Sequence, residues 1–245
     1  MILRRITAHV QEQNWTAIAI DFVIVVVGVF IGIQVSNWNA ERVERAREVS
    51  YLIALTEDFG AIIAELESDI ARYESIANAM TLLLEQSRRA APDTTLAALN
   101  EAAALLVRME GTPIVSDTYA NLTGSGDLAL LRSQAVKNAM SSFFGKAEVV
   151  QLVGDTHEMQ LVNIFQPYII DHLDYAGMFR DNQGLSTSAG FEPDRILTAL
   201  PTARFRNVVA VKWDIVTDLR GLLLSALAEA KAVETLLAAE AEANR

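Results

Sequence analysis

The chain has 245 residues, and its 31 acidic and 20 basic side chains give a formal net charge of −11. An acidic surface repels phosphate groups, so this balance argues against nucleic acid and anionic lipid as partners. The absence of cysteine excludes disulfides, thiolate metal sites and cysteine nucleophiles. Five prolines and twelve glycines, among many Ala, Leu and Glu residues, predict a mostly α-helical chain.

The most apolar stretch runs from Trp15 to Trp38, and residues 17–35 within it are apolar apart from Asp21 and Gln34. About 20 residues at ~1.5 Å each form about 30 Å of helix, which is the thickness of a bilayer core. The stretch is longer than the apolar region of a secretory signal peptide, and no small-residue cleavage site follows it. The sequence therefore predicts a single transmembrane helix, kept as an uncleaved anchor.

Small residues recur every four positions in this helix, at Gly28, Gly32 and Ser36. They share one helical face and would allow the backbone of another helix to approach closely. Asp21 lies seven residues before Gly28, close to the same face. Two interpretations of Asp21 remain open: its carboxylate lies near enough to the headgroups to stay hydrated, or it pairs with a donor on a neighbouring helix.

The ends of the helix and its flanks suggest how it lies in the membrane. Trp15 and Trp38 bracket it and are expected at the two interfaces, where aromatic rings with a polar edge are favoured. Residues 1–14 have apolar positions at helical spacing and suit a short interfacial segment. Positive charges lie on both sides of the helix and do not decide its orientation. We expect residues 1–14 in the cytoplasm and residues 39–245 in the periplasm of a bacterial inner membrane.

The helix is expected to continue from residue 40 to about residue 88, and to stop before Pro92, because proline disfavours helix at the preceding residue. Apolar residues recur there at spacings of three and four, which is typical of a helix that buries one stripe against others. They are Leu52, Leu55, Phe59, Ile62, Leu66, Ile70, Tyr73, Ala77, Met80 and Leu84.

Shorter elements are predicted next. A helix is expected at about 95–109, with Asp93 or Thr94 as its N-cap. Residues 116–133 resemble two short helical turns bounded by glycines, with Ser116 as the first N-cap. Together they form the most individual local pattern after the transmembrane stretch.

Two further long helices are expected, one from Ser133 to about Phe165 and one at about 203–241. Pro167 should either kink or end the first of them. The glycine-rich residues 176–192 are interpreted as the principal loop. The stripe of the last helix contains Val208, Val209, Trp213, Ile215, Val216, Leu219, Leu222, Ala226, Val233 and Leu236. The predicted fold is therefore all-α, with one N-terminal transmembrane helix that continues into an antiparallel bundle of long amphipathic helices.

Candidate metal ligands are few. His157 and His172 are the only histidines after the apolar stretch, and acidic residues flank both. Zinc requires three or four ligands within about 2.3 Å, but fifteen residues of helix would separate the two rings by about 22 Å. We expect both on solvated helix faces. P-loop, serine-nucleophile and di-iron patterns are not found, so no catalytic residue, metal or cofactor is expected.

Two stretches carry a resemblance to a known family. Residues 24–48, IVVVGVFIGIQVSNWNAERVERARE, resemble the opening of a family of uncharacterised bacterial membrane proteins, in which a glycine-containing span ends in Asn-Trp-Asn. Residues 118–144, TYANLTGSGDLALLRSQAVKNAMSSFF, resemble the same family's aromatic helix, Ser/Gly-Asp turn and helix with aromatic residues at its end. Ala40 stands where the family often has an acidic residue. The resemblance implies a location and a fold, and no chemistry.

Two functional hypotheses follow. The first is a non-catalytic, membrane-anchored scaffold or accessory subunit of an inner-membrane assembly, whose partners are the lipid bilayer and other membrane subunits or itself as a homo-oligomer. The second is a periplasmic ligand-sensing bundle that binds a small molecule near 116–133 or 176–192. A sensor normally needs a cytoplasmic output domain, which residues 1–14 are too short to provide. An enzyme is not expected.

Overall fold

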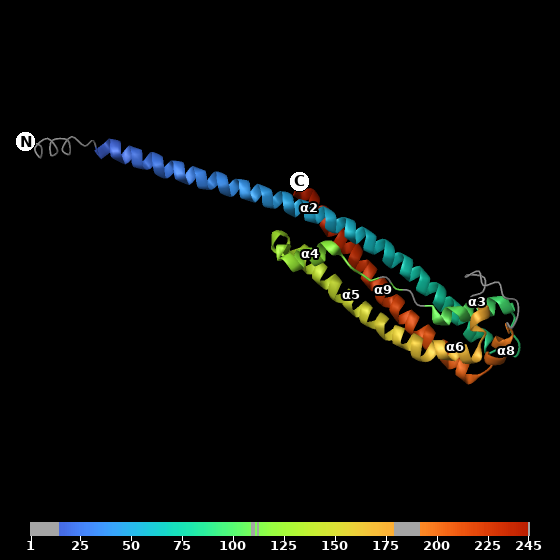
Figure 1. Cartoon of the computed structure of the whole chain (residues 1–245). Helices are drawn as coiled ribbons and strands as arrows, with labels where there is room; N and C mark the ends of the chain where they lie inside the picture. The colour runs from blue at the N-terminus through green and yellow to red at the C-terminus, as the bar shows by residue number, and fades with distance from the viewer. Residues whose placement is uncertain (1–14, 109–110, 112, 179–191, 245) are drawn as a thin grey trace, which may run out of the picture. The chain divides into compact units, whose positions relative to one another are not determined.

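The structure is a computed structural model (Figure 1). It describes residues 15–108, 111, 113–178 and 192–244, except for the side chains of residues 15–19 and 21. All regular secondary structure in this part of the chain is helical, so the predicted all-α class is confirmed. Most of the predicted loop at 176–192 lies outside the described residues.

The elements follow the chain in the order α2 (Trp15–Gln86), α3 (Leu96–Ala104), the 3₁₀ turn η1 (Leu105–Val107), α4 (Asp117–Ser125), the 3₁₀ turn η2 (Asp127–Leu130), α5 (Gln134–Gln160), the π-helical turn η3 (Leu161–Phe165), α6 (Gln166–His172), α7 (Tyr175–Met178), α8 (Arg195–Ala199) and α9 (Ala203–Ala243).

Helix α2 is continuous from the apolar stretch to Gln86, close to the predicted end at residue 88. The chain divides into two compact units, residues 1–50 and residues 51–243, and the boundary lies inside α2.

The C-terminal end of α2 is held by two hydrogen bonds. The Gln86 side chain donates to Asp93 Oδ1 at 2.5 Å and accepts from the Asp93 backbone N–H at 3.0 Å. Asp93 is therefore hydrogen-bonded to Gln86. The N-cap of α3 is Thr95, and not Asp93 or Thr94 as predicted.

The second unit is built on three long helices: α2 from Tyr51 onwards, α5 and α9 (Figure 1). Helix α9 runs antiparallel to α2, since Arg220 pairs with Glu74 and the later Lys231 pairs with the earlier Glu67. It also runs antiparallel to α5. Helices α2 and α5 run parallel to each other, because the connection between them returns along the bundle; in Figure 1, α3 and α4 lie at opposite ends of α5.

Core positions of α9 follow a strict alternation of three and four residues, which is the spacing of a coiled-coil seam. They are Val209, Lys212, Val216, Leu219, Leu223, Ala226, Ala230, Val233 and Leu237. The predicted stripe was wrong by one residue at several places: Trp213 and Leu236 are 39% and 40% exposed. On α2, Ile76 and Leu83 are buried in place of the predicted Ala77 and Leu84.

The helix that begins after Ser133 is interrupted earlier than predicted. The π-helical turn η3 separates α5 from α6, and Pro167 lies in the first turn of α6. A proline ring within a helix clashes with the carbonyl four residues before it, which here belongs to Asn163. A π-helical turn is wider than an α-helical turn and can relieve such a clash, which accounts for an interruption that precedes the proline.

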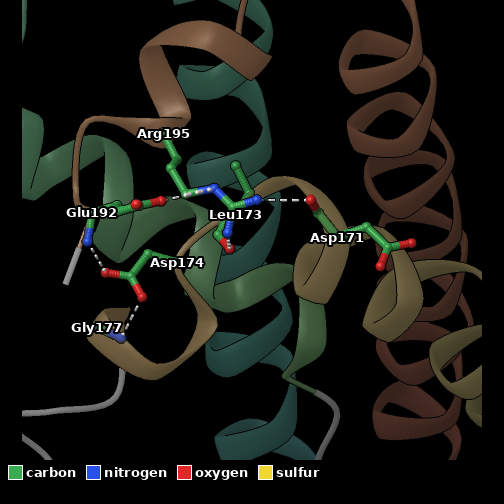
Figure 2. Close-up of polar contacts among 6 residues, drawn as sticks. All are labelled: Asp171, Leu173, Asp174, Gly177, Glu192 and Arg195. Atoms are coloured by element: carbon green, nitrogen blue, oxygen red, sulfur yellow. Dashed lines mark hydrogen bonds and ion pairs between the residues drawn. The ribbon is translucent and has the colours of Figure 1, made fainter. Parts of the chain in front are cut away.

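The junction between α6 and α8 is held by a small polar network (Figure 2). Asp174 Oδ1 accepts from the Gly177 N–H at 3.1 Å, and its Oδ2 accepts from the Glu192 N–H at 2.9 Å. Arg195 donates to the carbonyls of Asp171 and Leu173 at 2.8 and 3.2 Å. These bonds fix the described chain on both sides of residues 179–191.

Helix α4 begins and ends as predicted. Ser116 Oγ accepts from the Tyr119 N–H at 3.0 Å, and Gly126 ends the helix with a φ of 81°, a left-handed conformation that favours glycine. Asp58 of α2 accepts from Ser116 Oγ at 2.5 Å and from the Thr118 N–H at 3.2 Å. The start of α4 is thereby attached to α2.

The substitution Ser116→Ala should destabilise the fold by about 1–2 kcal/mol, because it removes an N-cap and one of the hydrogen bonds to Asp58. Urea unfolding of the full chain in detergent micelles, followed by circular dichroism, measures this loss. Ser141→Ala, at an exposed position of α5, is the matched control. Equal stabilities of the two variants would show that the cap contributes nothing.

Candidate functional site

The apolar part of α2 is exposed within the part of the chain that the structure describes. Its large apolar side chains from Ile20 to Val35 are between 47% and 68% exposed. An 18-residue window in this helix has a mean hydropathy of 1.7, and none of it is buried. By length and composition the helix is therefore long and apolar enough to cross a membrane.

The predicted packing face is also open. A Cβ atom added at Gly28 or Gly32 would meet no other atom within 4 Å, and Ser36 is exposed. No contact within the described chain therefore requires small residues at these positions. Of the expected interface anchors, Trp38 is 65% exposed. The side chains of Trp15 and Asp21 lie outside the described part.

The expectation that both later histidines are solvated was wrong for His157, whose side chain is 1% exposed. His172 is exposed, with its ring centroid 4.6 Å from that of Tyr168. Among the described residues, no group of three or more His, Cys, Asp or Glu side chains is arranged to hold a metal ion. The two histidines therefore belong to different environments, and only His157 lies in the core.

The buried partner of His157 is Lys212 of α9, which is fully buried. Lys212 Nζ donates to the carbonyl oxygen of Arg108 at 2.8 Å and lies 3.1 Å from His157 Nε2. The ring of Phe165, placed by the π-turn, has its centroid 5.2 Å from the same nitrogen, within the range of a cation–π contact. Three different elements therefore surround one amine.

Burial controls the protonation of both groups. It lowers the pKa of Lys212 from 10.5 to about 7, because the ammonium loses its hydration. Burial, together with the positive charge of Lys212, lowers the pKa of His157 from 6.5 to about 3. His157 is therefore neutral at physiological pH. When its Nε2 accepts from the lysine, the proton lies on Nδ1, which has no partner in the described structure.

This arrangement does not present a reactive amine to a substrate. A lysine of lowered pKa is a stronger nucleophile at neutral pH, but the Lys212 side chain is 0% exposed. Its geometry suits a structural contact, which is satisfied only when α5, α9 and the segment after η1 are correctly aligned. The sequence interpretation missed Lys212, although it lies three residues after Val209 and four before Val216, in register with the buried stripe.

The segment that resembles a family element, residues 118–144, closes on itself in the structure. The rings of Tyr119 and Phe144 stack with centroids 4.2 Å apart and an interplanar angle of 11°. Phe143 packs against Phe59 of α2, with centroids 5.0 Å apart. Tyr51 of α2 donates to Asp127 at 3.2 Å. The two ends of this segment therefore meet, and both contact α2.

No family model, curated protein sequence or solved structure matches the chain. The resemblance of residues 24–48 and 118–144 to a bacterial membrane protein family stays a prediction.

Lys212 should make stability depend on pH. Its pKa is about 7 when folded and 10.5 in its ordinary state, so between these values the unfolded chain binds more protons than the folded one. The free energy of unfolding should therefore rise with pH across this window, by at most ~1.4 kcal/mol per pH unit. Lys212→Met should remove this rise in urea unfolding curves of the full chain, and Lys137→Met should retain it. Equal slopes in the Lys212→Met and Lys137→Met variants would contradict the burial of a titrating amine.

His157 should make the stability of the fold depend on pH in the acidic range. Because its folded pKa is about 3, the unfolded chain binds an additional proton between pH 3 and 6.5, and stability should fall as the pH decreases through this window. His157→Gln should lose less stability than the wild type between pH 6.5 and pH 4.5, as measured by thermal unfolding. His172→Gln, at the exposed histidine, should behave like the wild type. The same decrease in all three proteins would contradict this account.

Proposed function

We propose that the chain is a single-span protein of a bacterial inner membrane, and that its helical bundle acts without catalysis as an accessory or scaffold domain for other proteins. The observation that supports this most is the uncovered apolar surface of α2. Apolar surface removed from water contributes roughly 25 cal/mol per Å². A row of side chains that are about half exposed, from Ile20 to Val35, is therefore stable only in a lipid or protein environment.

The proposed orientation places residues 1–14 in the cytoplasm and the bundle in the periplasm. Long domains are translocated largely regardless of their charge, so the net charge of −11 does not oppose it. A chain without cysteine is compatible with an oxidising compartment. The acidic bundle is also unsuited to lying flat on anionic lipid headgroups.

The proposed lateral contact uses the face with Gly28, Gly32 and Ser36, together with Asp21. The open space around both glycines supports this, because a neighbouring helix would fill it. The neighbour is either a second copy of the chain or a helix of another membrane subunit. In a dimer of two copies, the same face of each copy would lie at the contact, as in two-fold symmetric dimers.

Photo-cross-linking in native membranes tests the proposal. At 100° per residue, Val25 lies on the same face as the two glycines, whereas Val23 lies on the opposite face. A photoreactive benzoylphenylalanine at residue 25 should produce adducts of higher mass, and the same residue at position 23 should produce few.

Adding Gly28→Leu and Gly32→Leu should reduce the adducts from position 25 several-fold, because the larger side chains prevent close approach of the helices. Mass spectrometry of the adducts identifies the neighbour. A chain that remains monomeric with the probe at either position would contradict the proposal.

A further inference from the structure

Three neighbouring cavities that share lining residues lie around Ile114, which precedes α4. Their volumes are about 290, 260 and 400 Å³, and Ile114 lines all three. Helix α2 forms one wall, with residues from Asp58 to Tyr73, and α5 forms the other, with residues from Phe144 to Glu158. We call this continuous surface the acidic groove.

Carboxylates and apolar side chains make up most of the acidic groove. Its apolar part includes Ile62, Leu66, Val150, Leu219 and Leu223. Seven acidic residues line it, and its described lining contains no Lys, Arg or His. The acidic residues are Asp58, Glu65, Asp69, Asp117, Glu148, Asp155 and Glu158.

The bundle itself neutralises only some of these charges. Asp69 pairs with Arg72 at 2.7 Å, and Asp58 is engaged by Ser116 and Thr118. By contrast, Glu148 and Glu158, both exposed on α5, form no ion pair with any residue that the structure describes. The groove therefore has negative charge that is free to meet a partner.

An apolar anchor point lies beside these charges. Val115 is 65% exposed and lines two of the three cavities. Leu152, four residues after Glu148 on α5, is 66% exposed and lines none of the three. An exposed apolar side chain at the edge of a cavity can anchor a bound molecule. Charge alone would not explain these side chains, so the occupant should have an apolar side as well.

We propose that the acidic groove binds a basic amphipathic segment of a partner protein. This rests on the proposed function, because it assigns to the bundle a surface and a partner chemistry. Lysine or arginine side chains would meet Glu148 and Glu158, and an apolar side would pack on Val115 and the cavity floor. A second copy of the chain, with its own charge of −11, lacks this complementarity, as do nucleic acid and anionic lipid.

The test uses the full chain in nanodiscs of phosphatidylcholine, whose headgroups carry no net charge. The probe is a synthetic peptide of lysine and leucine, with the leucines at helical spacing, titrated by isothermal calorimetry against empty nanodiscs as reference. A second peptide has the same lysines, with serine in place of leucine. The groove variant is Glu148→Gln/Glu158→Gln, and the matched control is Glu85→Gln/Glu101→Gln, which removes the same charge at exposed positions outside the groove.

The wild type and the control variant should bind the lysine–leucine peptide with similar affinity, whereas the groove variant should bind it about tenfold more weakly. The lysine–serine peptide should bind the wild type about tenfold more weakly than the lysine–leucine peptide. Hydrogen exchange should show peptide-dependent protection in α5 between residues 147 and 158. Equal loss of affinity in both variants, or equal binding of both peptides, would overturn the proposal in favour of unspecific attraction to an acidic surface.

The outcome is separable from that of the proposed function. If the membrane cross-links form but the groove and control variants bind the peptide equally, the partner is held by α2 and the groove proposal fails alone. If the peptide binds as expected but no cross-link forms, the groove proposal holds, while lateral contact in the membrane is refuted.

Discussion

An apolar helix that the described residues leave exposed is the constraint on which the rest of the molecule depends. The side chains of α2 between Ile20 and Val35 are about half exposed among the described residues, and such apolar surface is unfavourable in water. A bilayer removes this surface from water and satisfies the backbone through helical hydrogen bonds. A helix placed there would anchor the chain in the membrane, and residues 51–243 form a second compact unit.

The bundle meets a different constraint, because its core contains a lysine. A strict seam of three and four residues would permit several alignments of three long helices, since alanine and leucine pack in many registers. Lys212 is satisfied in one alignment, with His157 on α5 and the carbonyl of Arg108 beside its amine. The π-turn contributes by placing Phe165 over the same nitrogen. This polar group in the core therefore disfavours other alignments of the three helices. Its burial also lowers the pKa of the lysine.

Much of the fold could be predicted from local signals, whereas the candidate sites could not. The cap at Ser116, the start of a long helix at Ser133 and the glycine at the end of α4 depend on chemistry within a few residues, and they are found as expected. Lys212 was missed because the predicted stripe of α9 included only apolar residues, although the spacing of Lys212 matched the buried stripe. The acidic groove is lined by residues of α2, of the segment around Ile114 and of α5. Only the parallel course of α2 and α5 brings these carboxylates together, and no local pattern encodes that course.

The most direct test of the central claim is fractionation of the full chain after expression in bacteria, followed by extraction of the membranes with alkaline carbonate. If α2 crosses the bilayer, the protein should remain in the membrane pellet after carbonate and enter solution only with detergent. Recovery of the folded protein in the soluble fraction, without detergent, would contradict the account, because the side chains from Ile20 to Val35 would then be covered by something other than lipid.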